Sequence, residues 1–216
     1  MASYKINYEK LIKLYKDSGK DILKTRCPLL NQQHYLYAEL DLILGSGTCK
    51  NFKKKWEDIV PVVIAVAQSE SCAVLELLPV IISANKRSCT AGDYFFYVHE
   101  DSSNIASAIK KHKRETPFIL KIGDTSYTVI VDSTIPFIES ACSTEALLQL
   151  ISVYYVFDIQ WCKKVLPTLR FIRTIVMRLQ DDVPTQCVSH DLFIVQFKKM
   201  YDLMYAVDSD VIDSDA

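Results

Sequence analysis

The sequence predicts a predominantly helical α+β protein with a small sheet of three mostly antiparallel strands. Half of the 216 residues are hydrophobic, which is enough to bury a core in one large domain or in two small ones that share it. Apolar residues recur at helical spacing toward both ends, and the middle holds short runs rich in aromatic and β-branched residues. The predicted order is therefore helices, then strand, helix and two strands, then helices again.

The first half begins with a series of predicted helices. Apolar positions separated by lysines indicate an amphipathic helix over residues 8–18. Similar patterns indicate helices over residues 32–44 and 51–59. Gly45 and Gly47 follow the second of these, where glycine suits the end of a helix.

Two prolines leave the next segments less regular. Pro61 does not have to end the helix before it and can instead open another one over residues 62–67. Residues 73–82 are apolar all round, which indicates a fully buried helix. Pro79 is expected to kink or end that helix, because proline removes a backbone donor and clashes with the preceding turn.

The middle of the chain changes character. Residues 94–99 are rich in aromatic side chains and predict a strand. Asp101 or Ser102 can cap a helix that runs to about residue 113. The β-rich runs 117–122 and 127–131 are separated by four residues that include a glycine, which predicts a hairpin.

Apolar helices are predicted again after the hairpin. Ser143 or Thr144 can cap a long helix over residues 145–157. A second helix is expected over residues 161–179, with Pro167 as its kink. Both segments are apolar enough to belong to the core.

The chain is expected to divide into two halves that pack on each other. Residues 1–83 form the helical half, and residues 84–206 form the half with the strand, helix, hairpin and later helices. The last helix is predicted over residues 191–205. Residues 207–216 carry four aspartates and are expected to be a disordered acidic tail.

Charge and cysteine content bound the protein class. The net charge is −1, but residues 1–56 hold 11 Lys and Arg against 5 Asp and Glu, so the N-terminal part is basic. The seven cysteines include no pair closer than 17 residues, whereas zinc ligands usually come as C-x₂₋₄-C pairs. Free thiols in a reducing compartment, cytoplasm or nucleus, are the expected state.

Recognisable catalytic, metal and cofactor motifs are absent from the sequence. Five glycines form neither a G-x-G-x-x-G nor a P-loop arrangement. The four histidines, His34, His99, His112 and His190, belong to no H-E-x-x-H or similar motif. We therefore expect no enzyme activity, no metal and no cofactor. The longest apolar stretches are about half the ~20 residues that a membrane span needs, so no membrane partner is expected either.

Two sets of side chains are candidates for binding. Tyr154, Tyr155, Trp161, Arg170 and Arg173 lie on or beside the helix over 145–157, and Tyr, Trp and Arg are enriched at protein interfaces. The same residues also suit a core helix and its edge. Basic clusters at Lys53, Lys54 and Lys55 and at Lys110, Lys111, Lys113 and Arg114 could contact phosphates of a nucleic acid.

The aromatic neighbours of the first lysine cluster allow two interpretations. Phe52 and Trp56 could stack on bases beside Lys53–Lys55. Their spacing of four residues equally places them on the buried stripe of a helix. The near-neutral charge of the whole chain favours the second interpretation, because dedicated nucleic-acid binders are usually basic.

Several apolar motifs resemble a poorly characterised animal family. They are Cys27-Pro28-Leu29-Leu30, Asn51-Phe52 with Trp56, Thr116-Pro117-Phe118-Ile119-Leu120, Glu145-Ala146-Leu147-Leu148-Gln149-Leu150, Tyr154-Tyr155-Val156-Phe157-Asp158-Ile159-Gln160 and Leu169-Arg170-Phe171-Ile172-Arg173. The resemblance runs from about residue 24 to 180. The family comprises insect and fish proteins that resemble the C-terminal region of sterile-alpha-motif-containing, mobile-element-associated proteins. It implies a shared fold and no catalytic residue.

Two functions follow as expectations. The first is a non-enzymatic interaction or scaffold module that binds an unknown protein partner or itself inside the cell, for example in a nuclear regulatory complex. The second is a nucleic-acid-associated protein derived from a mobile element. The complete set of core elements without a chemical constellation favours the first.

Overall fold

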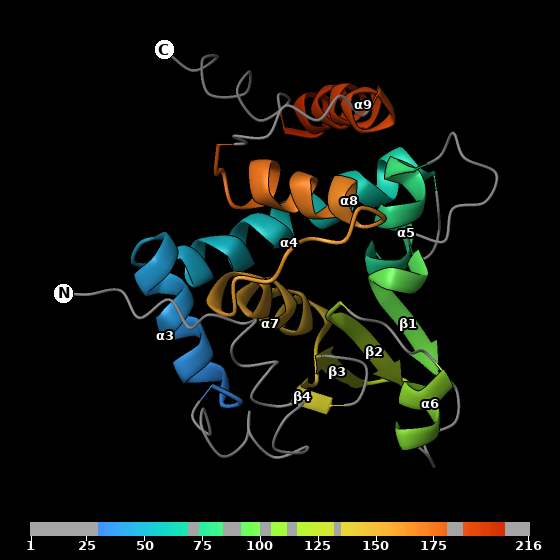
Figure 1. Ribbon diagram of the computed structural model, residues 1–216. Coiled ribbons are helices and arrows are strands. Elements are labelled where there is room, and N and C mark those ends of the chain that lie inside the picture. The colour runs from blue at the N-terminus through green and yellow to red at the C-terminus, as the bar shows by residue number, and fades with distance from the viewer. Residues whose placement is uncertain are drawn as a thin grey trace.

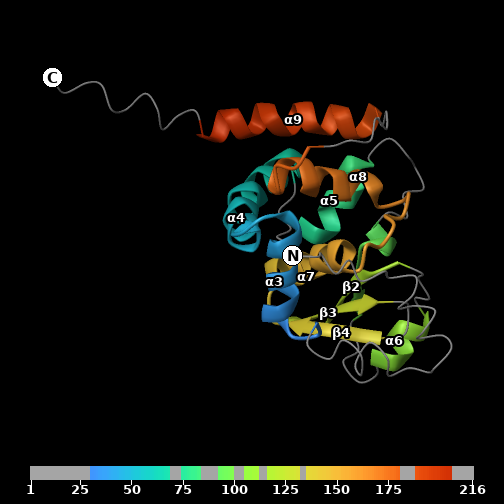
Figure 2. The ribbon, with the colours of Figure 1, turned by 60° about the vertical axis from the view of Figure 1, so that its left-hand side comes forward.

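The computed structural model describes residues 30–68, 74–83, 92–99, 105–111, 116–131, 135–180 and 188–205. These residues stack in layers (Figures 1 and 2). Helix α9 forms the outermost layer, α4, α5 and α8 lie beneath it, and α7 lies between these helices and a small sheet. The predicted helix over 8–18 and the predicted tail over 207–216 lie outside the described residues.

Helices α3 (Gln33–Leu44) and α4 (Thr48–Ala67) form a corner that one carboxylate holds. The Asp41 carboxylate accepts hydrogen bonds from the backbone N–H of Gly47 at 3.2 Å and of Cys49 at 2.9 Å. Gly47 is the N-cap of α4 and Cys49 lies in its first turn, where backbone N–H groups have no partner within the helix. Asp41 therefore supplies from α3 the cap that α4 does not have of its own.

Neither proline ends its helix. Helix α4 continues through Pro61 as one element, so the predicted separate helix over 62–67 is wrong. Helix α5 (Val74–Ile82) likewise continues beyond Pro79, which lies buried within it. Burial of Val62, Val63 and Ile82 on these helices explains the continuity, because packing outweighs the hydrogen bond that each proline removes.

The sheet has four strands in the order β1-β2-β3-β4, so the prediction of three strands is wrong in number. The elements in this part of the chain are the 3₁₀ turn Gly92–Tyr94, β1 (Phe96–His99), α6 (Ile105–Lys111), β2 (Phe118–Ile122), β3 (Ser126–Val131) and β4 (Ile135–Ser140). Strands β1 and β2 are parallel, with α6 between them in sequence, and the other two pairs are antiparallel. The predicted hairpin is confirmed as β2 and β3.

Strand β4 was missed because Pro136 interrupts its pattern. It is an edge strand, where a residue without an N–H is tolerated. The pairing shifts from Val129↔Ile138 to Ile130↔Pro136, so Phe137 is the extra residue of a β-bulge. The side chain of Phe137 meets Phe157 edge to face, with ring centroids 5.6 Å apart.

Side chains of the strands alternate between two hydrophobic clusters. Ile119 and Val129 belong to the large core that includes α7. Phe118, Leu120 and Ile130 face the opposite side, where they pack with Ala108 and Ile109 of α6. The sheet is therefore covered by α7 on one face and α6 on the other, as the period of two along a strand requires.

Helix α7 (Ser143–Val156) is the centre of the molecule, and ten of its 14 residues are buried. Its N-cap is Cys142, whose sulfur accepts from the Glu145 backbone N–H at 3.5 Å, and not Ser143 or Thr144 as predicted. The Glu145 carboxylate accepts from Gln33 Nε2 at 2.7 Å and from the Tyr37 hydroxyl, and it pairs with Lys53 Nζ. One carboxylate thus ties α3, α4 and α7 together.

The chain after α7 is less helical than predicted. Helix α8 spans Leu166–Phe171, a π-helical turn, η2, spans Ile172–Val176, and α9 spans Val188–Tyr205. Residues 161–165 are not helical, so the prediction of one helix over 161–179 is wrong. Pro167 lies in the first turn of α8, where proline is well tolerated and marks a start instead of a kink.

Replacing Gln149 by methionine is expected to stabilise the fold. Gln149 is 0% exposed, and neither its side-chain nitrogen nor its oxygen has a hydrogen-bond partner among the described residues. Gln149→Met keeps the shape and removes the unsatisfied amide, which should raise the free energy of unfolding by about 1–2 kcal/mol. Urea unfolding measures the change, with Ser152→Ala as the contrast, because Ser152 donates to the Leu148 carbonyl at 2.7 Å. A loss of stability in Gln149→Met would show that ordered water satisfies the amide.

Stability is expected to fall in alkaline solution because two acids hold their protons in the folded state. Burial, followed by the hydrogen bond to Glu145, raises the pKa of Tyr37 above its ordinary 10.0, and burial raises the pKa of Cys49 from 9.0 to about 12. Above pH 9 the unfolded chain releases these protons first, so the folded state binds more and stability declines as pH rises.

Urea unfolding between pH 8 and pH 11 tests this pH dependence. Cys49→Ala should flatten the decline that begins near pH 9, and Tyr37→Phe should flatten the part that begins near pH 10. Cys162→Ala is the control and should keep the decline of the parent protein. An unchanged slope in both test variants would contradict the assignment.

Candidate interaction surface

The described residues show no arrangement for metal chemistry or for spanning a membrane. Within the ranges of chain that the structure covers, no group of three or more His, Cys, Asp or Glu side chains could hold a metal ion. None of the described helices is both long enough and apolar enough to cross a bilayer. Binding surfaces are therefore the sites to compare.

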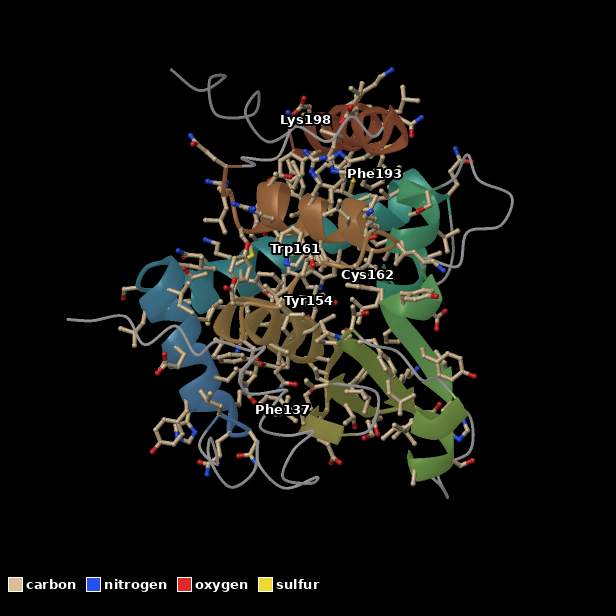
Figure 3. The ribbon with its side chains drawn as sticks, viewed as in Figure 1. Phe137, Tyr154, Trp161, Cys162, Phe193 and Lys198 are labelled. Carbon is tan, nitrogen blue, oxygen red and sulfur yellow. The ribbon has the colours of Figure 1, made fainter. Side chains whose placement is uncertain are left out.

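The predicted aromatic surface is mostly internal. Tyr154 is 2% exposed and donates to the Pro117 carbonyl at 3.1 Å, so it lies in the core. Figure 3 places it on α7, between the upper helices and the sheet. Its inclusion in the predicted surface is wrong, because α7 is covered on the side that carries Tyr154.

Tyr155, Trp161 and Arg173 come together as a side-chain stack. The rings of Tyr155 and Trp161 meet edge to face with centroids 6.2 Å apart, and the Arg173 guanidinium lies 5.8 Å from the Trp161 ring centroid. Arg170 is half-buried on α8, and its backbone carbonyl accepts a hydrogen bond from the Thr174 hydroxyl. The stack connects three parts of the chain: α7, the segment that precedes α8, and η2. Its contacts therefore stabilise the fold.

The first basic cluster is divided among three environments. Lys53 pairs with Glu145, and Lys55 Nζ donates to the Tyr201 hydroxyl at 2.8 Å and lies 4.5 Å from the centroid of that ring. Lys54 is exposed. The three lysines therefore do not form the single basic surface that was predicted.

The aromatic neighbours of these lysines do not face solvent. Phe52 is 1% exposed and Trp56 is 2% exposed, and their rings stack with centroids 6.4 Å apart. The interpretation as the buried stripe of a helix is confirmed, and these two rings cannot stack on bases.

The second basic cluster lies mostly outside the described residues. Lys110 and Lys111 end α6, and only their backbone is described. Lys113 and Arg114 fall outside the described part of the chain. Their role in binding stays a prediction.

Helix α9 packs on the helical layer through an aromatic inner face. Phe193 and Phe197 are each 2% exposed, and both meet Phe171 of α8 edge to face, at centroid distances of 5.2 and 5.1 Å. His190 is buried on the same side. Figure 3 shows Phe193 between α9 and α8.

The outer face of α9 is also apolar. Leu192, Val195 and Leu203 are 52%, 65% and 60% exposed. At 100° per residue they lie within about 80° of one another, with the exposed Lys199 between them, and their centre is roughly 130° from Phe193 and Phe197. A helix at the surface normally turns polar residues outward, so the exposed apolar side chains make this face of α9 a candidate contact surface.

The sequence contained a signal for this outer stripe. Leu192, Val195 and Leu203 do not fit the same helical face as Phe193 and Phe197, and two faces in one helix indicate two contacts. The predicted surface lies instead on and beside the more apolar segment 145–157. The structure shows that its apolar residues face inward.

Comparison with protein families, with characterised proteins and with solved structures gives no match. The resemblance to insect and fish proteins therefore stays a prediction.

Loss of Trp161 is expected to weaken the fold and leave association unchanged. Trp161→Ala removes the edge contact with Tyr155 and the cation–π contact with Arg173, which together contribute about 1–2 kcal/mol to the free energy of unfolding. Trp161→Phe should retain most of this contribution to the free energy of unfolding. Thermal unfolding and light scattering measure the two properties separately. Loss of association in a stable Trp161→Ala variant would assign the stack to a partner surface.

Proposed function

We propose that this protein is a non-enzymatic interaction module that associates with a second copy of itself through the outer face of α9. The exposed apolar stripe of Leu192, Val195 and Leu203 is the observation that carries the proposal. The three described cysteines are free thiols, which agrees with a reducing compartment. The stripe suits a helical contact, because its residues recur at i, i+3 and i+11 on one helix.

A second copy suits this face because two α9 helices can pair antiparallel about a two-fold axis. An antiparallel α9 that sets Val195 opposite Leu203 of the second copy repeats the same contact on the other side of the two-fold axis. In that register Lys198 lies within one turn of Asp202 of the second copy, because the two residues occupy the same flank of the helix. Apolar contacts and charge pairs therefore form twice each, while Lys199 faces Lys199 of the second copy at the two-fold axis and weakens the contact.

The charges on the exposed side of α9 favour a second copy of the chain as the binding partner, and not a nucleic acid. Lys198 and Lys199 are balanced by Asp191 and Asp202, and all four side chains are exposed. Figure 3 labels Lys198 on α9, the layer farthest from the sheet. A face that carries equal positive and negative charge can pair with the same face of an antiparallel copy. A nucleic acid would instead require an excess of positive charge.

The proposed contact is small, so association should be weak and concentration-dependent. Sedimentation velocity across a wide concentration range is expected to show a monomer–dimer equilibrium. Val195→Glu places a charge in the centre of the apolar stripe and should leave the protein monomeric. Since Val195 is 65% exposed, the fold should tolerate the change.

A charge exchange tests the pairing directly. Lys198→Glu and Asp202→Lys should each weaken association, because each sets like charges opposite one another in the symmetric dimer. An equimolar mixture of the two variants should recover it, because opposite charges then face each other at both positions. Glu139→Lys, on exposed β4, is the control and should associate like the parent. A parent protein that is monomeric at all concentrations would contradict the proposal.

A further inference from the structure

A second feature of the surface is a cleft of about 480 Å³ between α4, the end of η2 and the inner side of α9. Its lining is partly apolar and carries three cationic residues, Lys54, Lys55 and Arg178, against the single carboxylate of Asp58. Asn51 and Tyr201 also line it. This cleft is separate from the outer stripe of α9.

The positive charge of the cleft is largely uncompensated. No carboxylate of the described residues forms an ion pair with Lys54 or Arg178. Lys55 is held by the Tyr201 hydroxyl, a neutral partner, at 2.8 Å. With Asp58 included, the lining has an excess of two positive charges, which a dianionic group would balance.

Arg178 reaches the cleft through an irregular backbone. The Met177 N–H donates to the Ile172 carbonyl at 3.0 Å, which closes the π-helical turn η2, and Arg178 then adopts a φ of 56°. The Leu179 N–H donates to the Arg173 carbonyl at 3.0 Å, so the left-handed residue ends this helical segment, as Gln68 ends α4. The π turn itself is an irregularity of the kind that is frequent at functional sites.

We propose that this cleft binds a phosphate monoester. The monoester carries between one and a half and two negative charges near neutral pH, which matches the excess of the lining. Lys54, Lys55 and Arg178 provide donors from two elements, and a guanidinium suits the paired oxygens of a phosphate. The cleft is larger than a phosphate group, so it has room for the carbon group that the phosphate esterifies.

Calorimetric titration with phenyl phosphate tests the site in the full chain. Saturable binding is expected, and diphenyl phosphate, a diester with one charge, should bind at least about tenfold more weakly because a charge-assisted contact is lost. Arg178→Gly and Lys54→Gln should each weaken phenyl phosphate binding by about tenfold or more. Lys163→Gln is the control, because Lys163 is exposed and lies outside the cleft.

Arg178→Gly separates binding from folding. Glycine adopts a positive φ without steric cost, so this variant should unfold at the same temperature as the parent or higher while it loses affinity. Equal loss in Lys163→Gln, or no saturable binding by the parent, would overturn the proposal. A single-stranded DNA without a terminal phosphate that binds through the same two side chains as tightly as phenyl phosphate would also overturn it, in favour of a nucleic-acid backbone.

Discussion

The burial of α7 on several sides is the constraint on which the other elements depend. Ten of its 14 residues are buried, and it separates the helical layer from the sheet. A helix in this position has few places for a charge, and Glu145 occupies one of them. Its carboxylate gathers Gln33, Tyr37 and Lys53, so three helices meet at one acceptor group. Truncating such a group leaves donors without partners, which costs more than a surface ion pair does.

Local patterns predicted the elements that depend on local chemistry. The β2–β3 hairpin follows from two β-rich runs around Gly123, which adopts a φ of 57°. The effect of Pro61 and Pro79 is harder to predict from local sequence, because burial of the surrounding side chains decides whether a helix continues through proline. Strand β4 depends on its partner β3 and on a bulge at Phe137, and neither is visible in its own six residues.

Local sequence also fails to predict which of the candidate side chains face a partner. Tyr154, Trp161 and Arg173 have the composition of an interface, yet their contacts are within the chain. Composition cannot distinguish a side chain that waits for a partner from one already paired in the fold. The lysines of α4 diverge for a related reason, since neighbours in sequence point to different sides of a helix. Arg178 joins Lys54 only through folding, because more than 120 residues separate them in sequence.

The position of α9 in the chain has a consequence for synthesis. Phe171 is covered by Phe193 and Phe197, which leave the ribosome after every other described element. Until then, the apolar side of α8 that they cover faces water. The nascent chain therefore exposes this aromatic surface only while the segment from Phe171 to Phe197 is being made, and the completed α9 then covers it.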